Sequence, residues 1–199
     1  HAYAMPSDPI DLAELFEAAI AHHQSGNLPE AERHYRAILQ ASPHQFEALH
    51  YLGVLQAQRE RYDDAVTLIR RALEINPDSM EARSNLANIY FKMLRFKEAK
   101  EEYARLEKIL PKEKSGDLWN NLGCIYQVEG FLDEALEKYR LALSLDPKLN
   151  FAHFNIAKIY LIRGKQDLAL QEILASLPEA NSVTPKERMR CREIIDEQI

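Results

Sequence analysis

The chain has 199 residues, 46% of them apolar and 28% charged, and long stretches consist of good helix formers, so the composition predicts an all-α protein. Lys and Arg number 25 against 31 Asp and Glu, which gives a formal net charge of -6. This balance excludes a strongly basic surface, so we expect no nucleic-acid partner.

Residues 1–11 precede the first regular pattern. They open with His1-Ala2-Tyr3-Ala4-Met5, which resembles a tag remnant, and we assign 1–11 to this remnant and an N-terminal lead-in. No apolar run approaches the roughly 18 residues of a membrane-spanning helix, so we expect no membrane insertion. Two cysteines without a disulfide framework favour a cytoplasmic location, and a native leader that has been removed is the alternative.

From residue 12 onward the sequence repeats itself. Prolines recur at intervals of 34, 34 and 36 residues, at Pro43, Pro77, Pro111 and Pro147. Alanines keep the same spacing, at Ala31, Ala65, Ala99, Ala135 and Ala169. Two series in the same register indicate a true repeat. They predict five units, at residues 12–45, 46–79, 80–113, 116–149 and 150–183.

Each unit has the pattern of two helices joined by a tight turn. The eighth residue of every unit is small, which lets two helices approach closely: Ala19, Gly53, Ala87, Gly123 and Ala157. The twenty-fourth residue is large and fills the space beside it: Tyr35, Ile69, Tyr103, Tyr139 and Ile173. The turns fall at Gly26, Gly130 and Gly164, where glycine can adopt a positive φ, and at Glu60 and Leu94 in the second and third units.

The last unit and the residues after it differ from this pattern. The fifth unit has Asn181 in place of the closing proline and Pro178 three residues earlier, so its second helix should end early. Thr184-Pro185-Lys186-Glu187 then forms a capping box with proline at the first helical position. We therefore predict a C-terminal capping helix over residues 184–199, which covers the end of the stack.

The units resemble the tetratricopeptide repeat. The fourth unit carries nearly the whole pattern of that family: Trp119, Leu122, Gly123, Tyr126, Ala135, Tyr139, Ala142 and Pro147. The resemblance implies a right-handed α-α superhelix, a solenoid in which the first helix of each pair lines a concave groove. It also implies a scaffold that binds other proteins. A helix pair this short cannot bury its apolar face alone, which agrees with a stacked architecture.

The resemblance places the candidate binding site in the concave groove. Position six of the last three units is asparagine, and other polar residues lie nearby, so the candidate set is Asn85, Asn88, Asn120, Asn121, Asn155 and Lys158. Asparagine amides donate and accept, so a ladder of them can hold the backbone of an extended peptide. A similar ladder occurs in O-linked N-acetylglucosamine transferases. The alternative is structural: each amide bonds to a neighbouring repeat or to water.

Some family members clamp a C-terminal carboxylate with two lysines, two asparagines and an arginine. Asn88 and Asn121 match the asparagines, but Ser84, Phe151 and Asn155 stand where the cations belong, which argues against a clamp. The sequence contains no HExxH, no CxxC, no histidine pair at i and i+4, no Gly-rich phosphate loop and no G-x-S-x-G. We therefore expect no enzyme activity, no metal site and no cofactor.

The leading hypothesis is a protein–protein interaction scaffold that binds an extended segment or a helix of a partner in its groove. A second hypothesis is the substrate-docking region of a larger enzyme, since residues 28–55 resemble repeats of glycosyltransferase-like proteins. A third is a self-assembling structural module, because apolar residues gather near the N-terminal edge: Leu12, Leu15, Phe16 and Ile20.

Overall fold

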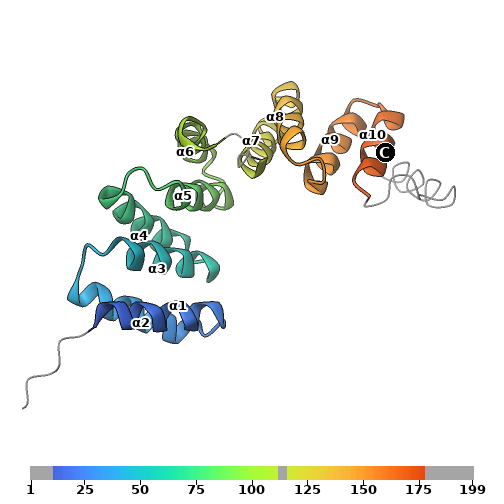
Figure 1. Cartoon of the computed structure of the whole chain (residues 1–199). Coiled ribbons are helices and arrows are strands. Elements are labelled where there is room, and N and C mark those ends of the chain that lie inside the picture. Colours follow the sequence, from blue (N-terminus) through green and yellow to red (C-terminus); the bar gives the residue numbers. More distant parts are fainter. Residues whose placement is uncertain (1–10, 112–115, 178–199) are drawn as a thin grey trace, which may run out of the picture. The chain divides into compact units, whose positions relative to one another are not determined.

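The computed structural model describes residues 11–111 and 116–177, and these ranges contain helices and no strands (Figure 1). The chain divides into two compact units, residues 1–109 and 110–199. The first unit holds α1 (Leu12–Gln24), α2 (Leu28–Ala41), α3 (Phe46–Gln58), α4 (Tyr62–Ile75), α5 (Met80–Lys92) and α6 (Phe96–Ile109). The second holds α7 (Gly116–Val128), α8 (Leu132–Leu145), α9 (Asn150–Ile162) and α10 (Gln166–Ala175).

Side-chain caps and prolines set the ends of several helices. Asp11 accepts from the backbone N–H of Ala13 at the start of α1, and Gln45 and Ser79 serve α3 and α5 in the same way. Pro29 occupies the first turn of α2, where its missing N–H costs nothing. The periodic prolines follow the second helices by two residues, since proline cannot continue a helix.

The turns inside the helix pairs use the left-handed region of φ. Gly26, Gly130 and Gly164 have φ of 80°, 86° and 70°, as the sequence predicts. Glu60 and Leu94 adopt φ of 60° and 59° at the equivalent places. These two side chains therefore occupy a conformation that favours glycine, because the turn geometry is common to the helix pairs.

The core forms where small residues of the first helices meet large residues of the second. A Cβ added to Gly53 would lie 2.5 Å from Cγ1 of Ile69, and one added to Gly123 would lie 2.6 Å from Cε1 of Tyr139. Helices pack within each pair and against the following pair in both units. One core cluster of the first unit contains Ala19, Ala31, Tyr35, Leu52 and Leu55. Its counterpart in the second unit contains Ala135, Tyr139, Ala152, Ile156 and Ile159.

The predicted fold class, all-α helix pairs packed in consecutive order, is confirmed. The exact number of repeats and the unit boundaries stay predictions. The capping helix at 184–199, the end of the fifth unit and most of the assigned tag remnant lie outside the described residues.

Candidate functional site

A hollow opens between two first helices, α1 and α3, in the first unit. Its volume is about 310 Å³, and it is lined by Ile20, His23, Gln24, Tyr51, Val54 and Gln58. These residues stand at positions six, nine, twelve and thirteen of their repeats, which the family resemblance assigns to the groove. We refer to this hollow as the α1–α3 pocket.

Aromatic rings pack around Tyr51, one of the residues that line the α1–α3 pocket. The rings of Tyr35 and Tyr51 stack with centroids 6.4 Å apart and planes 12° apart, and Phe16 contacts Tyr51 at 5.9 Å. Tyr35 is fully buried. Its burial, with a smaller contribution from Tyr51, raises its pKa to about 12, so its hydroxyl stays protonated and can donate a hydrogen bond at neutral pH.

A chain of hydrogen bonds crosses one wall of the α1–α3 pocket. Nδ1 of His23 lies 3.2 Å from the hydroxyl of Tyr35, and Nε2 lies 3.1 Å from Oε1 of Gln58. A neutral ring protonated at Nε2 satisfies both contacts, because it accepts from Tyr35 and donates to Gln58. The pocket therefore combines apolar lining residues with polar ones, of which His23 and Gln58 are held in place by hydrogen bonds.

In the first unit the asparagines of the candidate ladder already have partners. Nδ2 of Asn85, in α5, lies 2.9 Å from Nε2 of His50 in α3. Burial lowers the pKa of His50, against an opposing effect of the Glu81 charge, so the ring is neutral and accepts from the amide. Oδ1 of Asn88 accepts from the hydroxyl of Tyr103 at 2.7 Å. Asn85 thus bonds to a neighbouring helix pair, as the structural alternative expects.

In the second unit the amide of Asn155, in α9, lies 3.5 Å from Sγ of Cys124 in α7. Oδ1 of Asn120 is buried without a hydrogen-bond partner, so this atom does not face an incoming peptide. Asn121 is half-buried and Lys158 is exposed. Asn85 belongs to the first unit and Asn121 and Asn155 to the second, so a ladder through all three stays a prediction.

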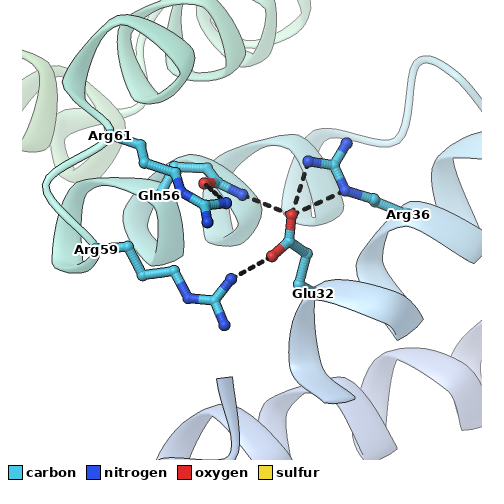
Figure 2. Close-up of polar contacts among 5 residues, drawn as sticks. All are labelled: Glu32, Arg36, Gln56, Arg59 and Arg61. Carbon is cyan, nitrogen blue, oxygen red and sulfur yellow. Dashed lines mark hydrogen bonds and ion pairs between the residues drawn. The ribbon is translucent and has the colours of Figure 1, made fainter. Parts of the chain in front are cut away.

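Sequence reasoning missed a polar network that joins α2 to α3. Glu32 accepts from Arg36 at 2.7 Å, from Nε2 of Gln56 at 2.9 Å and from Arg59 (Figure 2). Arg61 donates to Gln56 at 3.4 Å. Burial raises the pKa of Glu32, but the hydrogen bonds from Arg36 and Gln56 and the charges of Arg36 and Arg59 outweigh it and lower the pKa overall.

This network ties two adjacent helix pairs together, because its carboxylate comes from one pair and its donors come largely from the next. Gln56 is the residue from which this network could have been predicted. It stands where three other units carry tyrosine, and the structure buries it fully. A polar residue at an otherwise aromatic position needs a buried partner, and Glu32 is that partner.

The histidines also gather in a way that motif spacing did not reveal. His22, Glu30 and His34 each bring one potential ligand atom to the turn between α1 and α2. A spacing of four residues between histidines does not occur here, because His22 and His34 lie in different helices. The turn between α1 and α2 brings His22 close to Glu30 and His34. The expected absence of a metal site therefore stays an untested prediction.

The described helices are too short or too polar for any of them to cross a membrane. Several curated proteins match the chain in sequence, and two of them show the extent of the match. Anaphase-promoting complex subunit 3 of Dictyostelium discoideum is 33% identical over 99 residues, covering 49% of this chain and 10% of that protein. Human protein O-mannosyl-transferase TMTC1 is 33% identical over 171 residues, covering 68% of this chain and 19% of that protein. The chain thus spans a small fraction of both relatives.

Solved structures share the fold. MamA residues 41 to the end, from Desulfovibrio magneticus RS-1, superposes with a TM-score of 0.75 at 18% identity and covers 92% of this chain and 97% of that one. Three tetratricopeptide repeat family models match residues 16–80, 56–116 and 116–149. The repeat family supports a protein-interaction scaffold. The chain belongs to the tetratricopeptide repeat family.

Proposed function

We propose that this chain is a protein-interaction scaffold and that the α1–α3 pocket receives an extended segment of a partner polypeptide. The observation that carries the proposal is the lining of the pocket. Ile20, Tyr51 and Val54 offer apolar surface, while His23, Gln24 and Gln58 offer donors and acceptors. An extended peptide presents both kinds of group, because its backbone is polar and alternate side chains point to one side.

The size of the α1–α3 pocket favours a peptide side chain over a small molecule. At about 310 Å³ it lies at the low end of the range for small-molecule sites, and it is open on one side. One apolar side chain fits against Tyr51 and Val54. The adjoining backbone of the partner would then reach the amide of Gln58, which His23 holds in place.

The asparagines of the first helices are further candidate contacts, which we assign within each unit separately. In the first unit, the bond to His50 uses only Nδ2 of Asn85 and orients an amide whose carbonyl takes no part in that bond. In the second unit, we assign partner contacts to Asn121, Asn155 and Lys158. Asn88 and Asn120 contribute less directly, because one carbonyl accepts from Tyr103 and the other is buried.

The test uses peptides selected from a random library displayed on phage, with the full chain as bait. Val54→Arg places a long charged side chain in the α1–α3 pocket. It should lower the affinity for the selected peptides by tenfold or more, and tenfold corresponds to about 1.4 kcal/mol. The matched control is Thr67→Arg, at an exposed β-branched residue of α4. Peptides that bind both variants equally well would place recognition elsewhere.

A second candidate function is substrate docking within a larger enzyme, favoured by the 33% identity to the O-mannosyl-transferase. The match covers 19% of that protein, so the chemistry would lie outside the matched part. An open reading frame that continues past Ile199 into a transferase domain would support this role, and a stop codon there would end it. Self-association is tested separately by sedimentation at increasing concentration.

A further inference from the structure

Three potential metal ligands meet at the turn between α1 and α2. His22 lies near the end of α1, and Glu30 and His34 lie one turn apart in α2. One ligand atom from each side chain lies within 4.8 Å of the other two. The rings of His22 and His34 have centroids 5.3 Å apart. We propose that these three side chains bind a divalent transition-metal ion of the zinc class.

The local sequence builds this arrangement. Gly26, with φ of 80°, ends α1, and Pro29 in the first turn of α2 starts the returning helix. Residues four positions apart share one helix face, so Glu30 and His34 both face the end of α1. His22 turns toward them, whereas the adjacent His23 lines the α1–α3 pocket. The proposed metal site is therefore separate from the proposed peptide site.

A hydrogen bond of His34 to the backbone prepares the ring as a ligand. Its Nδ1 lies 2.7 Å from the backbone oxygen of Glu30. A carbonyl oxygen only accepts, so Nδ1 carries the proton and the lone pair is on Nε2. Histidines that bind metal commonly donate their other N–H to a backbone carbonyl or a carboxylate, which fixes the ring in this way. The bond thus selects the tautomer that a metal ion requires.

The other two ligands make contacts that a metal ion would replace. Nδ2 of Asn27 approaches Nδ1 of His22 at 3.5 Å, which is a long contact. Arg33 donates to Oε2 of Glu30 at 2.8 Å and 3.1 Å. The carboxylate of Glu30 is thus held in an ion pair with Arg33. Arg33 competes with a metal ion for this carboxylate.

The donor set selects the kind of ion. Two imidazole nitrogens and one carboxylate oxygen form a three-ligand set that zinc uses, with a fourth position open for water or a partner's side chain. Magnesium and calcium prefer oxygen ligands. Tetrahedral zinc places its donor atoms about 3.4 Å apart. The three half-buried side chains must therefore close in from their present separation of up to 4.8 Å.

The first test is calorimetric titration of Zn²⁺ into the full chain after treatment with a chelator. We expect saturable binding of about one ion per chain. His22→Ala and His34→Ala should each weaken Zn²⁺ binding by about a hundredfold or more. Even residues that only hydrogen-bond to a metal ligand change the metal affinity by about 10–100-fold. The matched control is His44→Ala, an exposed histidine between α2 and α3, which should bind as the wild type does.

Arg33→Gln should raise the affinity for Zn²⁺, whereas the histidine variants lower it. A rise in affinity cannot result from general damage to the fold, so this variant tests the metal site itself. This variant frees Glu30 from its ion pair, so it should bind Zn²⁺ several-fold more tightly than the wild type. Circular dichroism of each variant reports whether the helices are intact.

A second readout is the visible spectrum of the Co²⁺-loaded chain. The wild type should show the strong absorption of four-coordinate Co²⁺, and His22→Ala should lose it. The proposal is overturned if the wild type shows no saturable Zn²⁺ binding, if His34→Ala and His44→Ala bind equally well, or if Arg33→Gln binds more weakly. Peptide binding by the α1–α3 pocket is measured independently, so failure of one proposal leaves the other intact.

Discussion

The pairs α5–α6 and α9–α10 solve one packing problem with two different basic side chains. In α5–α6, Nη1 of Arg83 lies 2.7 Å from Glu102, and Nη2 donates to the backbone oxygen of Pro77. In α9–α10, Nδ1 of His153 lies 2.8 Å from Glu172, and Nε2 lies 3.1 Å from the backbone oxygen of Pro147. The basic residue stands at position four, the carboxylate at position twenty-three, and the carbonyl belongs to the preceding proline.

The same two positions take a third form in α7–α8, where Nζ of Lys138 lies 5.1 Å from the ring centroid of Trp119. Here the cation comes from the second helix and an aromatic face replaces the carboxylate. The comparison shows that positions four and twenty-three contact each other in all three helix pairs, whereas the type of interaction differs from pair to pair. Arginine stays protonated and therefore donates at both of its contacts. An imidazole ring donates from both nitrogens only when it is protonated.

The largest expected effect comes from removing one carboxylate. The side chains of Arg83 and Glu102 are both 11% exposed, so Glu102→Ala leaves a buried, unpaired charge. This should lower the free energy of unfolding by about 3–5 kcal/mol. Glu172→Ala should cost only about 0.5–1.5 kcal/mol, because the His153 ring keeps its second contact, with the backbone oxygen of Pro147. Chemical denaturation followed by circular dichroism measures both.

Arg105 provides the control for this pair of variants. It also contacts Glu102, at 3.1 Å, but its side chain is 61% exposed, so Arg105→Ala should cost less than about 1 kcal/mol. If Arg105→Ala and Glu102→Ala destabilise the protein equally, exposure does not decide the strength of these pairs and the comparison fails.

The next effect tests the feature that the helix pairs share, the close contact between positions eight and twenty-four. Gly123→Leu drives a large side chain toward the ring of Tyr139, whose hydroxyl donates to Gln127 and cannot move freely. Overpacking of this kind costs about 1–3 kcal/mol. Glu137→Leu, on the exposed face of α8, is the control and should shift the thermal midpoint far less. Equal midpoints would contradict the assigned register.

These examples show which parts of the structure the sequence predicts. Positions eight and twenty-four were predictable because only small residues allow the close approach, so residue size repeats with the period. The contacts between positions four and twenty-three were not predictable, since two of them join a basic residue to a carboxylate and one joins a lysine to an aromatic ring, so no single residue type fills either position. The partners of the asparagines were missed for a related reason: His50 and Cys124 lie in other helix pairs, and their approach depends on how the pairs stack.

A smaller effect contrasts His153, which faces two acceptors, with His50, which faces a donor. Burial lowers the pKa of His50, and the Asn85 amide donates to its neutral ring. Phe46 and Tyr51 pack against the ring, and Glu81 is the charged group that acts on it. Because the folded pKa is lowered, this contribution to stability is present above the unfolded value of about 6.5 and is lost as pH falls.

We therefore expect the wild type to lose about 0.5–1.5 kcal/mol of stability between neutral pH and pH 5 through this histidine. His50→Gln keeps a side chain that can accept from Asn85 but does not titrate, so its stability should change less over the same interval. Denaturation curves at a series of pH values provide the measurement. Parallel pH profiles for the two proteins would show that the buried ring is not the titrating group.

The smallest effect concerns the turns, where the helix pairs differ only in the residue that adopts positive φ. Leu94 has φ of 59° and is 72% exposed, so it bears the cost of the left-handed conformation and gains little from packing. That cost is about 1–2 kcal/mol for a residue with a Cβ, and glycine avoids it but loses more entropy on folding, about 0.5–1 kcal/mol. Leu94→Gly should therefore stabilise the protein by up to about 1 kcal/mol.

Gly130→Leu makes the reverse change in an equivalent turn, where a Cβ meets no neighbouring atom within 4 Å. This variant should destabilise the protein by a similar amount through backbone strain alone. Thermal midpoints that move in opposite directions would establish that the turn geometry is imposed by the repeat. A decrease in both would mean that the Leu94 side chain stabilises the turn by contacts that outweigh its strain.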